Sequence, residues 1–191
     1  MKHLFPKGLH EAFSPEMFRD RAVRPTIGIL IVVNGGILMV NPRRAGEESL
    51  PNYWTIPQEK VEFVDGNIVC AIRRGIQEEF GYTVPDKYFY SVKILGDMEN
   101  RLPLVRRESG ITTKVIRFVG IALPQFPIRL NLDENRAYKF VSSWGELDEA
   151  MSEVALRRVR KYTCTCEATL RACTCRLLPW GVPPGLQCEY T

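Results

Sequence analysis

The sequence predicts an α+β fold in which a mixed β-sheet is sandwiched between helices, an α/β/α arrangement. Three observations favour it. Apolar, β-branched runs recur along the chain, one amphipathic helical segment interrupts them, and a second helical segment follows the last of them. Because strands precede and follow the first helix, we expect a single sheet whose faces are covered by the helices.

The composition is sufficient for such a core. The chain has 191 residues, of which 45% are hydrophobic and 25% charged, values typical of globular proteins. Its formal net charge of +4 is compatible with polyanionic substrates without identifying one. The start, "MKHLFPKGLHEAF", lacks the apolar core of a signal peptide. The most apolar run is broken by Asn34-Gly35-Gly36 and is shorter than the roughly 20 residues of a spanning helix. We therefore expect a cytoplasmic protein without a membrane partner.

The strands follow from local pattern. Residues 26–33, "TIGILIVV", and 37–40, "ILMV", flank the turn "NGG" and predict a β-hairpin. Residues 53–56 predict a third short strand that ends at Pro57. Residues 88–95, 112–123 and 137–142 alternate between apolar and polar side chains, as strands do.

Two helices are expected between and after these strands. Residues 67–79 hold apolar side chains at helical spacing, and Gly81 stands near the expected C-cap. Ser143 and Glu146 have the spacing of a capping box that opens a second helix. Its apolar residues keep a helical period: Leu147, Ala150, Met151, Val154 and Tyr162.

The core domain is expected at residues 26–162, between an N-terminal extension (1–25) and a cysteine-rich tail (163–191). The tail holds five of the six cysteines and has no strong periodicity, which favours a poorly ordered, unpacked appendage. Its two C-x-C pairs, Cys164/Cys166 and Cys173/Cys175, leave a zinc site open, although structural zinc sites usually use C-x-x-C spacing. Disulfides are disfavoured in a cytosolic protein.

Two adjacent acids lie at the end of the first predicted helix. With Ile68 at zero on a helical wheel, Glu79 falls at roughly 20°, within the apolar stripe, and Glu78 at roughly 280°, on its flank. A carboxylate among apolar side chains is costly unless a cation or hydrogen-bond donors meet it. The alternative is that the helix frays at Glu78 and both acids are solvated.

Residues 57–82, "PQEKVEFVDGNIVCAIRRGIQEEFGY", resemble the Nudix box, whose pattern is G-x5-E-x7-R-E-U-x-E-E-x-G-U with U an aliphatic residue. The matching positions are Pro57, Lys60, Val61, Glu62, Asp65 (near the first Glu), Arg74, Ile76, Glu78, Glu79 and Gly81. The resemblance extends over residues 26–162, because the flanking strands and the closing helix follow the Nudix order. It implies the Nudix fold.

Three positions depart from the box. Glu59 occupies its first Gly, the spacing from Asp65 to Arg74 is one residue too long, and Gly75 replaces the Glu that follows the Arg. In the family this Glu and the paired acids form a metal-binding face, with the i, i+3, i+4 spacing of residues 75, 78 and 79. We therefore expect Gly75→Glu to restore a carboxylate, and to stabilise the helix by up to about 1 kcal/mol.

The resemblance implies a hydrolase that depends on Mg²⁺ or Mn²⁺, hard cations that prefer oxygen ligands. Glu78 and Glu79 would bind the metal, Asp65 and Glu62 would assist, and Arg74 would hold the glutamates by ion pairing.

A second segment, "DENRAYKFVSSWGEL", resembles a Nudix segment in which a Glu precedes an aromatic-Val-Ser strand. In bacterial Nudix RNA 5′-pyrophosphohydrolases this Glu lies seven residues before the Val, as Glu134 lies before Val141. The resemblance makes Glu134 a candidate metal ligand or general base. A solvated turn at "LDEN" is the alternative.

The substrate is indicated less closely. Arg43 and Arg44 stand where many Nudix proteins hold phosphate-facing basic residues, and residues 101–117 are rich in basic side chains, which a solvated hairpin loop also explains. "IPQ" after Trp54 is similar to the "FPQG" of Nudix enzymes that act on RNA or dinucleoside polyphosphates.

The resemblance implies cleavage of the pyrophosphate linkage of a nucleoside diphosphate derivative: a nucleotide sugar, a dinucleoside polyphosphate or an RNA 5′ end. It is also compatible with a homodimer. The alternative, for which Gly75 argues, is a catalytically weak or inactive Nudix-fold module that binds nucleotides or RNA.

Overall fold

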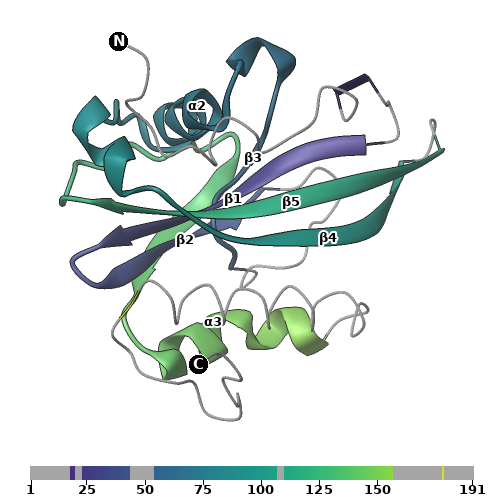
Figure 1. Ribbon diagram of the computed structural model, residues 1–191. Coiled ribbons are helices and arrows are strands. Elements are labelled where there is room, and N and C mark those ends of the chain that lie inside the picture. Colours follow the sequence, from purple (N-terminus) through teal and green to yellow (C-terminus); the bar gives the residue numbers. More distant parts are fainter. Residues whose placement is uncertain (1–17, 20–22, 44–53, 107–109, 157–177, 179–191) are drawn as a thin grey trace, which may run out of the picture.

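The computed structural model describes residues 18–19, 23–43, 54–106, 110–156 and 178 (Figure 1). Most of the expected N-terminal extension and, apart from Leu178, the whole cysteine-rich tail with both C-x-C pairs lie outside the described residues. The elements are β1 (Val23–Val33), β2 (Gly36–Pro42), β3 (Gln58–Lys60), η2 (Phe63–Asp65), α2 (Ile68–Phe80), η3 (Asp86–Ser91), β4 (Lys93–Arg106), β5 (Gly110–Leu123), β6 (Asn135–Val141) and α3 (Trp144–Leu156).

Six strands form one mixed sheet in the order β4-β5-β1-β2-β6, and β3 pairs with β1 outside this path. Strands β1 and β2 form the predicted antiparallel hairpin, in which Val32 pairs with Ile37. Its turn residues Asn34 and Gly35 both have positive φ, at 50° and 79°, as a two-residue turn matched to the strand twist requires. Strand β5 pairs in parallel with the whole of β1, from Val23 with Thr113 to Val33 with Leu123.

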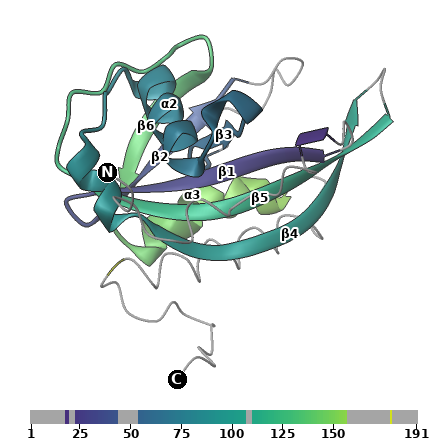
Figure 2. The same ribbon diagram turned by 45° about the horizontal axis from the view of Figure 1, so that its top comes forward.

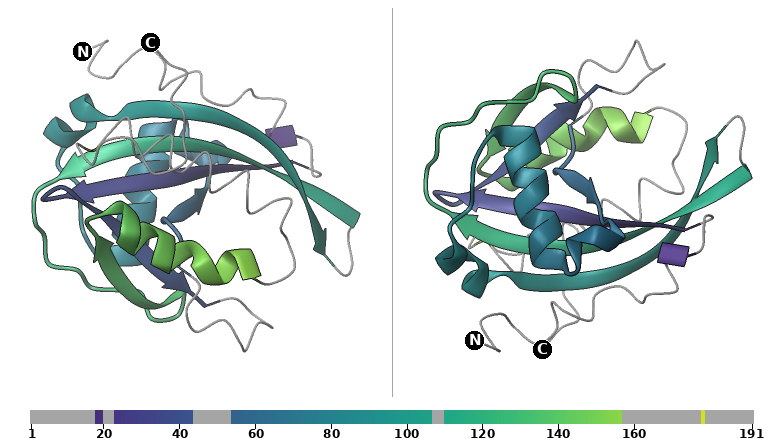
Figure 3. Two further views of the ribbon diagram at one scale, coloured as in Figure 1. Left: turned by 90° about the horizontal axis from the view of Figure 1, so that it is seen from below. Right: turned by 90° about the horizontal axis from the view of Figure 1, so that it is seen from above.

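The two helices cover opposite faces of the sheet. Figure 1 shows α2 above the sheet and α3 below it, and the views in Figures 2 and 3 agree. Alternate β1 residues enter two buried clusters, since successive strand side chains point to opposite faces. Ile27, Ile29 and Ile31 join the α2 side, and Leu30 joins the α3 side. The predicted α/β/α arrangement is therefore confirmed.

Capping contacts mark both ends of α2 and the start of α3. The side chain of Asn67 accepts a hydrogen bond from the Cys70 amide, and Gly81 ends α2 with a φ of 65°. In α3 the Glu146 amide donates to Ser143 Oγ at 3.3 Å, while the Glu146 carboxylate accepts from the Ser142 amide at 2.6 Å. Both predicted helices are present, although the return bond of the expected capping box goes to Ser142, and Tyr162, expected in the second helix, lies outside the described residues.

The predicted strand at residues 53–56 is wrong in position. Thr55 forms only an isolated bridge with Val40, and the strand in this region is β3, whose residues pair with Thr26–Gly28 of β1. Pro57 was expected to end the strand because it has no amide hydrogen. Its carbonyl nevertheless accepts from the Ile29 amide at 2.9 Å, so the chain stays against β1.

The predicted strand at residues 88–95 is half wrong, because its first residues form the 3-10 helix η3. Pro85 precedes that helix in an extended conformation, and the Tyr88 amide donates back to the Pro85 carbonyl at 3.1 Å. Phe89 is buried in the α2-side cluster. Burial of this ring selects the helical turn over the alternation in the sequence, and β4 begins at Lys93.

Leu178 is the one described residue of the cysteine-rich tail. It is 5% exposed and belongs to the α3-side cluster with Trp144 and Leu147. At this residue the finding differs from the expected unpacked appendage. Within the described ranges, no helix is long and apolar enough to cross a membrane.

Candidate active site

The paired acids lie in the last turn of α2. Glu79 is 5% exposed, as its place in the apolar stripe predicts, whereas the Glu78 side chain is 49% exposed. The helix does not fray before them, since the Gly81 amide still donates to the Gln77 carbonyl at 2.9 Å. The alternative of a frayed helix with two solvated acids is therefore wrong.

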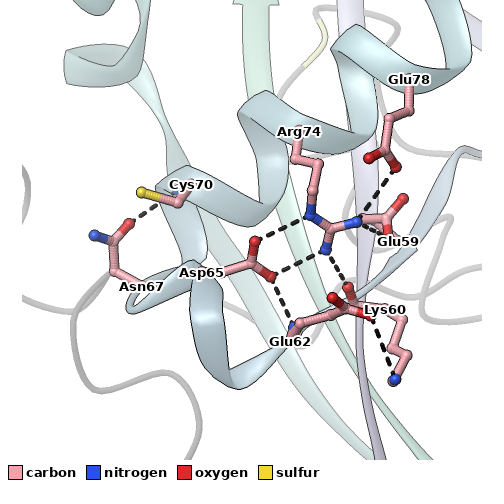
Figure 4. A network of polar contacts seen from close by, with 8 residues as sticks. All are labelled: Glu59, Lys60, Glu62, Asp65, Asn67, Cys70, Arg74 and Glu78. Carbon is pink, nitrogen blue, oxygen red and sulfur yellow. Dashed lines mark hydrogen bonds and ion pairs between the residues drawn. The ribbon is translucent and has the colours of Figure 1, made fainter.

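Arg74, one turn earlier on α2, is the hub of a polar network (Figure 4). Its guanidinium donates to both oxygens of Asp65 at 3.0 Å, to Glu59 at 2.8 Å and to Glu78 at 3.3 Å. It also reaches the Lys60 carbonyl at 2.7 Å. The hydrogen bonds to Asp65 are the chief reason that the pKa of Arg74 is raised above its ordinary value. One cation thus joins β3, the η2 turn and α2.

Asp65 and Glu62 occupy the loop between β3 and α2. The Asp65 side chain is 5% exposed, and its Oδ2 also accepts from the Glu62 amide at 2.7 Å. Both oxygens of Asp65 therefore hold Arg74 and the loop in place. The Glu62 carboxylate is half exposed and lies 3.5 Å from the Lys60 ammonium. Asp65 therefore positions Arg74, whereas the Glu62 carboxylate contacts Lys60, and the predicted assistance of both residues in metal binding stays a prediction.

Gly75 allows β3 to approach α2 closely. A Cβ built on Gly75 would lie 3.0 Å from both Cβ and Cγ of Glu59 and 3.2 Å from its Oε2. This contact is tighter than nearly all Cβ contacts, so Glu59 must shift by a few tenths of an ångström to admit a side chain at position 75. The gain expected from Gly75→Glu is therefore opposed by overpacking, because Glu59 lies where the new side chain would begin.

Glu134 reaches the same region through a loop that docks on the end of α2. The Arg129 amide donates to the Phe80 carbonyl at 2.9 Å, and the Asn131 amide donates to the Glu79 carbonyl at 2.8 Å. These bonds satisfy carbonyls that a helix end leaves without partners. Asn135, next to Glu134, directs its Nδ2 to Glu79 Oε2 at 3.4 Å.

Four carboxylates influence one another electrostatically: Glu59, Glu78, Glu79 and Glu134. Burial and, after it, the charges of Glu59, Glu134 and Glu78 together raise the pKa of Glu79 to about 8, against the opposing effect of the hydrogen bond from Asn135. Burial also raises the pKa of Glu59, against the effect of Arg74. We call these four residues the acidic cluster.

The acidic cluster has the donor chemistry of a hard-cation site. Mg²⁺ and Mn²⁺ take carboxylate oxygens, and a buried carboxylate with a raised pKa gains most from a cation. In the described part of the chain, no three His, Cys, Asp or Glu side chains stand as a group that could hold a metal ion. Two members, Glu59 and Glu78, instead share Arg74. Glu78 is half exposed, and an ion pair of this kind is weak enough to exchange.

Of the two residues predicted to face phosphate, the structure describes one, Arg43. The Arg43 amide donates to the Glu134 carbonyl at 2.6 Å, and Arg43 is exposed. Arg43 thus lies beside the loop that carries Glu134. Arg44 lies outside the described residues.

Sequence reasoning did not assign Glu59 or Asn135 to the site. Asn135 carries no signal of its own, since its contact with Glu79 spans 56 residues. A signal for Glu59 was present in the sequence. This chain departs from the Nudix box in two opposite ways: an acid replaces a glycine at 59, and a glycine replaces an acid at 75.

Comparisons with known proteins identify the fold. No family model matches the sequence, and no curated protein matches it in sequence. Among solved structures, the NUDIX hydrolase from Alicyclobacillus acidocaldarius is similar with a TM-score of 0.53 and 11% identity, over 77% of this chain and 90% of that chain. The NUDIX domain of Shewanella oneidensis NrtR, complexed with ADP ribose, has a TM-score of 0.51 and 12% identity, over 83% of this chain and 92% of that chain.

A third similar structure belongs to a longer protein. It is the bifunctional NMN adenylyltransferase/ADP ribose pyrophosphatase from Francisella tularensis, with a TM-score of 0.50 and 20% identity over 78% of this chain. The match spans 41% of that protein. At these identities the likeness shows the fold alone. The chain has the Nudix fold, as the resemblance in its sequence implied.

Proposed function

We propose that the protein is a metal-dependent hydrolase that cleaves the pyrophosphate linkage of a nucleoside diphosphate derivative. The observation that carries this proposal is Glu79: a carboxylate 5% exposed, in the last turn of α2, whose pKa is raised by burial and by the charges of three further acids. Burying a carboxylate close to other acids costs free energy and does not stabilise the fold. Such an arrangement is typical of a site built for a cation.

The residues of the site have separable roles. Glu79 and Glu78 would hold Mg²⁺ or Mn²⁺, and Arg74 would keep Glu78 oriented between turnovers. Glu134 would accept a proton from the attacking water at its carboxylate, because it is exposed at the rim of the acidic cluster. When bound, the metal neutralises phosphate charge and makes water a better nucleophile.

The fold neighbours and Arg43 support a proposal for the substrate class. One neighbour was solved in complex with ADP ribose, and another is named as an ADP ribose pyrophosphatase. Arg43 is exposed beside Glu134, where a guanidinium would meet phosphate oxygens. ADP ribose is therefore the first substrate to test, with nucleotide sugars, dinucleoside polyphosphates, NADH and triphosphorylated RNA as the wider panel.

The test is a phosphate and nucleotide release screen over this panel with Mg²⁺ or Mn²⁺. Glu78→Gln and Glu79→Gln should each reduce turnover by orders of magnitude while the protein stays folded, since each removes charge from a proposed metal ligand. Glu149→Gln is a matched control, because Glu149 is exposed on α3, across the sheet from α2. Wild-type rates in both site variants would refute the assignment.

The alternative is a nucleotide-binding module without turnover. It is favoured by Gly75, which leaves α2 with two acids in place of three, and by the lack, among the described residues, of a group poised to hold a metal. The two functions separate in one assay. Binding of ADP ribose by calorimetry, with no product after prolonged incubation with Mg²⁺ or Mn²⁺, would establish the binding module.

A further inference from the structure

Two departures from the Nudix box face each other in space. The box has a glycine where this chain has Glu59, and a glutamate where this chain has Gly75. Glu59 lies on β3 and Gly75 on α2, and the two elements pack against each other. The chain thus carries the same two residue types with their positions exchanged.

The geometry explains why the two departures occur together. A Cβ at position 75 would lie 3.0 Å from Cβ and Cγ of Glu59, so the two positions share one volume, which holds a single long side chain. The Glu59 side chain, 12% exposed, fills this volume from the strand. Its Oε2 lies 3.2 Å from the point where a side chain at position 75 would begin.

The charge environment of Glu59 is that of a site carboxylate. Its Oε1 shares the Nη1 of Arg74 with Glu78 (Figure 4). Glu59 therefore stands beside Glu78 at the guanidinium that joins β3 to α2.

We propose that Glu59 supplies, from strand β3, the metal-binding carboxylate that helix α2 lacks at Gly75. The inference rests on the proposed function, because it concerns the ion that this function requires. In this arrangement the metal would be held between a strand and a helix. Gly75 is then the residue that makes room for the ligand, and its lack of a side chain does not leave the site one carboxylate short.

The first test is a titration of the full chain with Mn²⁺, in which electron paramagnetic resonance measures the concentration of free Mn²⁺. Glu59→Gln should weaken Mn²⁺ binding on the order of tenfold, since affinity for hard cations follows the number of charged oxygen ligands. Glu149→Gln, the same chemical change on the far face of the sheet, should bind Mn²⁺ as the wild type does. Thermal unfolding of each variant confirms that the fold is kept.

The second test exchanges the two residues. Glu59→Gly alone should lose Mn²⁺ affinity, and Gly75→Glu alone should lower the melting temperature, because both side chains then compete for one volume. The double variant E59G/G75E should recover both properties. A glutamate at position 75 is adjacent to Arg74 in sequence and does not face it on the helix. Recovery of Mn²⁺ binding therefore reports a ligand and not a restored pair with Arg74.

Three results would overturn the inference. If Glu59→Gln binds Mn²⁺ like the wild type while Glu79→Gln does not, the proposed function stands and Glu59 only positions Arg74. If the double variant folds but fails to bind Mn²⁺, the two positions are not equivalent. If the wild type itself binds no Mn²⁺, the metal-dependent function and the role of Glu59 fail together.

Discussion

Replacing Glu79 with glutamine should stabilise the metal-free protein at alkaline pH. The carboxyl group is 5% exposed, and its pKa is raised from 4.5 to about 8. Between these two values the folded protein keeps a proton that the unfolded chain has already released. Stability is therefore full below about pH 4.5 and falls as pH rises to about 8. Glutamine resembles the protonated form at every pH, so the variant escapes this loss.

The size of the effect follows from the shift. One pKa unit corresponds to about 1.4 kcal/mol, so the rise from 4.5 to about 8 puts the cost of ionising Glu79 near 5 kcal/mol. The assay is urea denaturation between pH 4.5 and 9 in a chelator. Wild type and Glu79→Gln should unfold alike at the acidic end and diverge by several kcal/mol at pH 9. Glu149→Gln should show the same fall in stability between pH 4.5 and 9 as the wild type.

Metal should narrow the difference in stability between the two proteins. A ligand that binds only the folded state stabilises it in proportion to the logarithm of its concentration over Kd. Added Mg²⁺ should therefore raise the stability of the wild type at pH 9 and leave Glu79→Gln nearly unchanged. A wild type whose stability is flat from pH 5 to 9 in chelator would refute the assignment of Glu79 as a buried, strained acid. A variant that gains as much from Mg²⁺ as the wild type would refute its role as a ligand.

The remaining predictions concern packing and chemistry. Gly75→Ala should lower the free energy of unfolding by about 1 kcal/mol, because overpacking of its Cβ against a β3 side chain at 3.0 Å should outweigh the gain of about 1 kcal/mol that alanine brings to a helix; increased stability in urea would contradict this. Arg74→Lys should cost about 2 kcal/mol in the same assay, since lysine cannot form the two-point carboxylate pair, and an unchanged midpoint would count against the hub. Leu178→Ala should cost about 2–4 kcal/mol, as the residue is 5% exposed, whereas Leu132, 59% exposed, should tolerate alanine; equal melting temperatures would exclude a packed tail residue. Glu134→Gln should lower kcat more than it raises the Kd for Mn²⁺, and the reverse pattern would make Glu134 mainly a ligand.

Features that depend on neighbouring residues were predictable from the sequence. The hairpin at Asn34-Gly35 follows from turn chemistry, and the ends of α2 follow from Asn67 and Gly81. The burial of Glu79 follows from helical spacing alone. Together with the resemblance of residues 57–82 to the Nudix box, these patterns were enough to predict the fold correctly.

Features that depend on residues distant in sequence were not. Residues 88–91 were expected in a strand but form part of a 3-10 helix, in which the ring of Phe89 is buried in the α2-side cluster. The place of Glu59 could not be inferred from the box, since it depends on how closely β3 passes α2. Asn135 joined Glu79 only through a loop docked on the end of α2.

That docked loop has a consequence for the order in which the molecule assembles. The contact between Asn135 and Glu79 closes 56 residues of chain, and β5, which pairs in parallel with β1, lies between them in sequence. Closing long segments costs entropy that later contacts must offset. We infer that α2 and its Arg74 network form early, with Glu79 still in water, and that Glu134 arrives only when the sheet is complete. The repulsion between Glu134 and the other acids of the acidic cluster then arises only in the last step of folding. In a pulsed hydrogen-exchange experiment, the Arg129 and Asn131 amides should accordingly become protected later than the amides of α2.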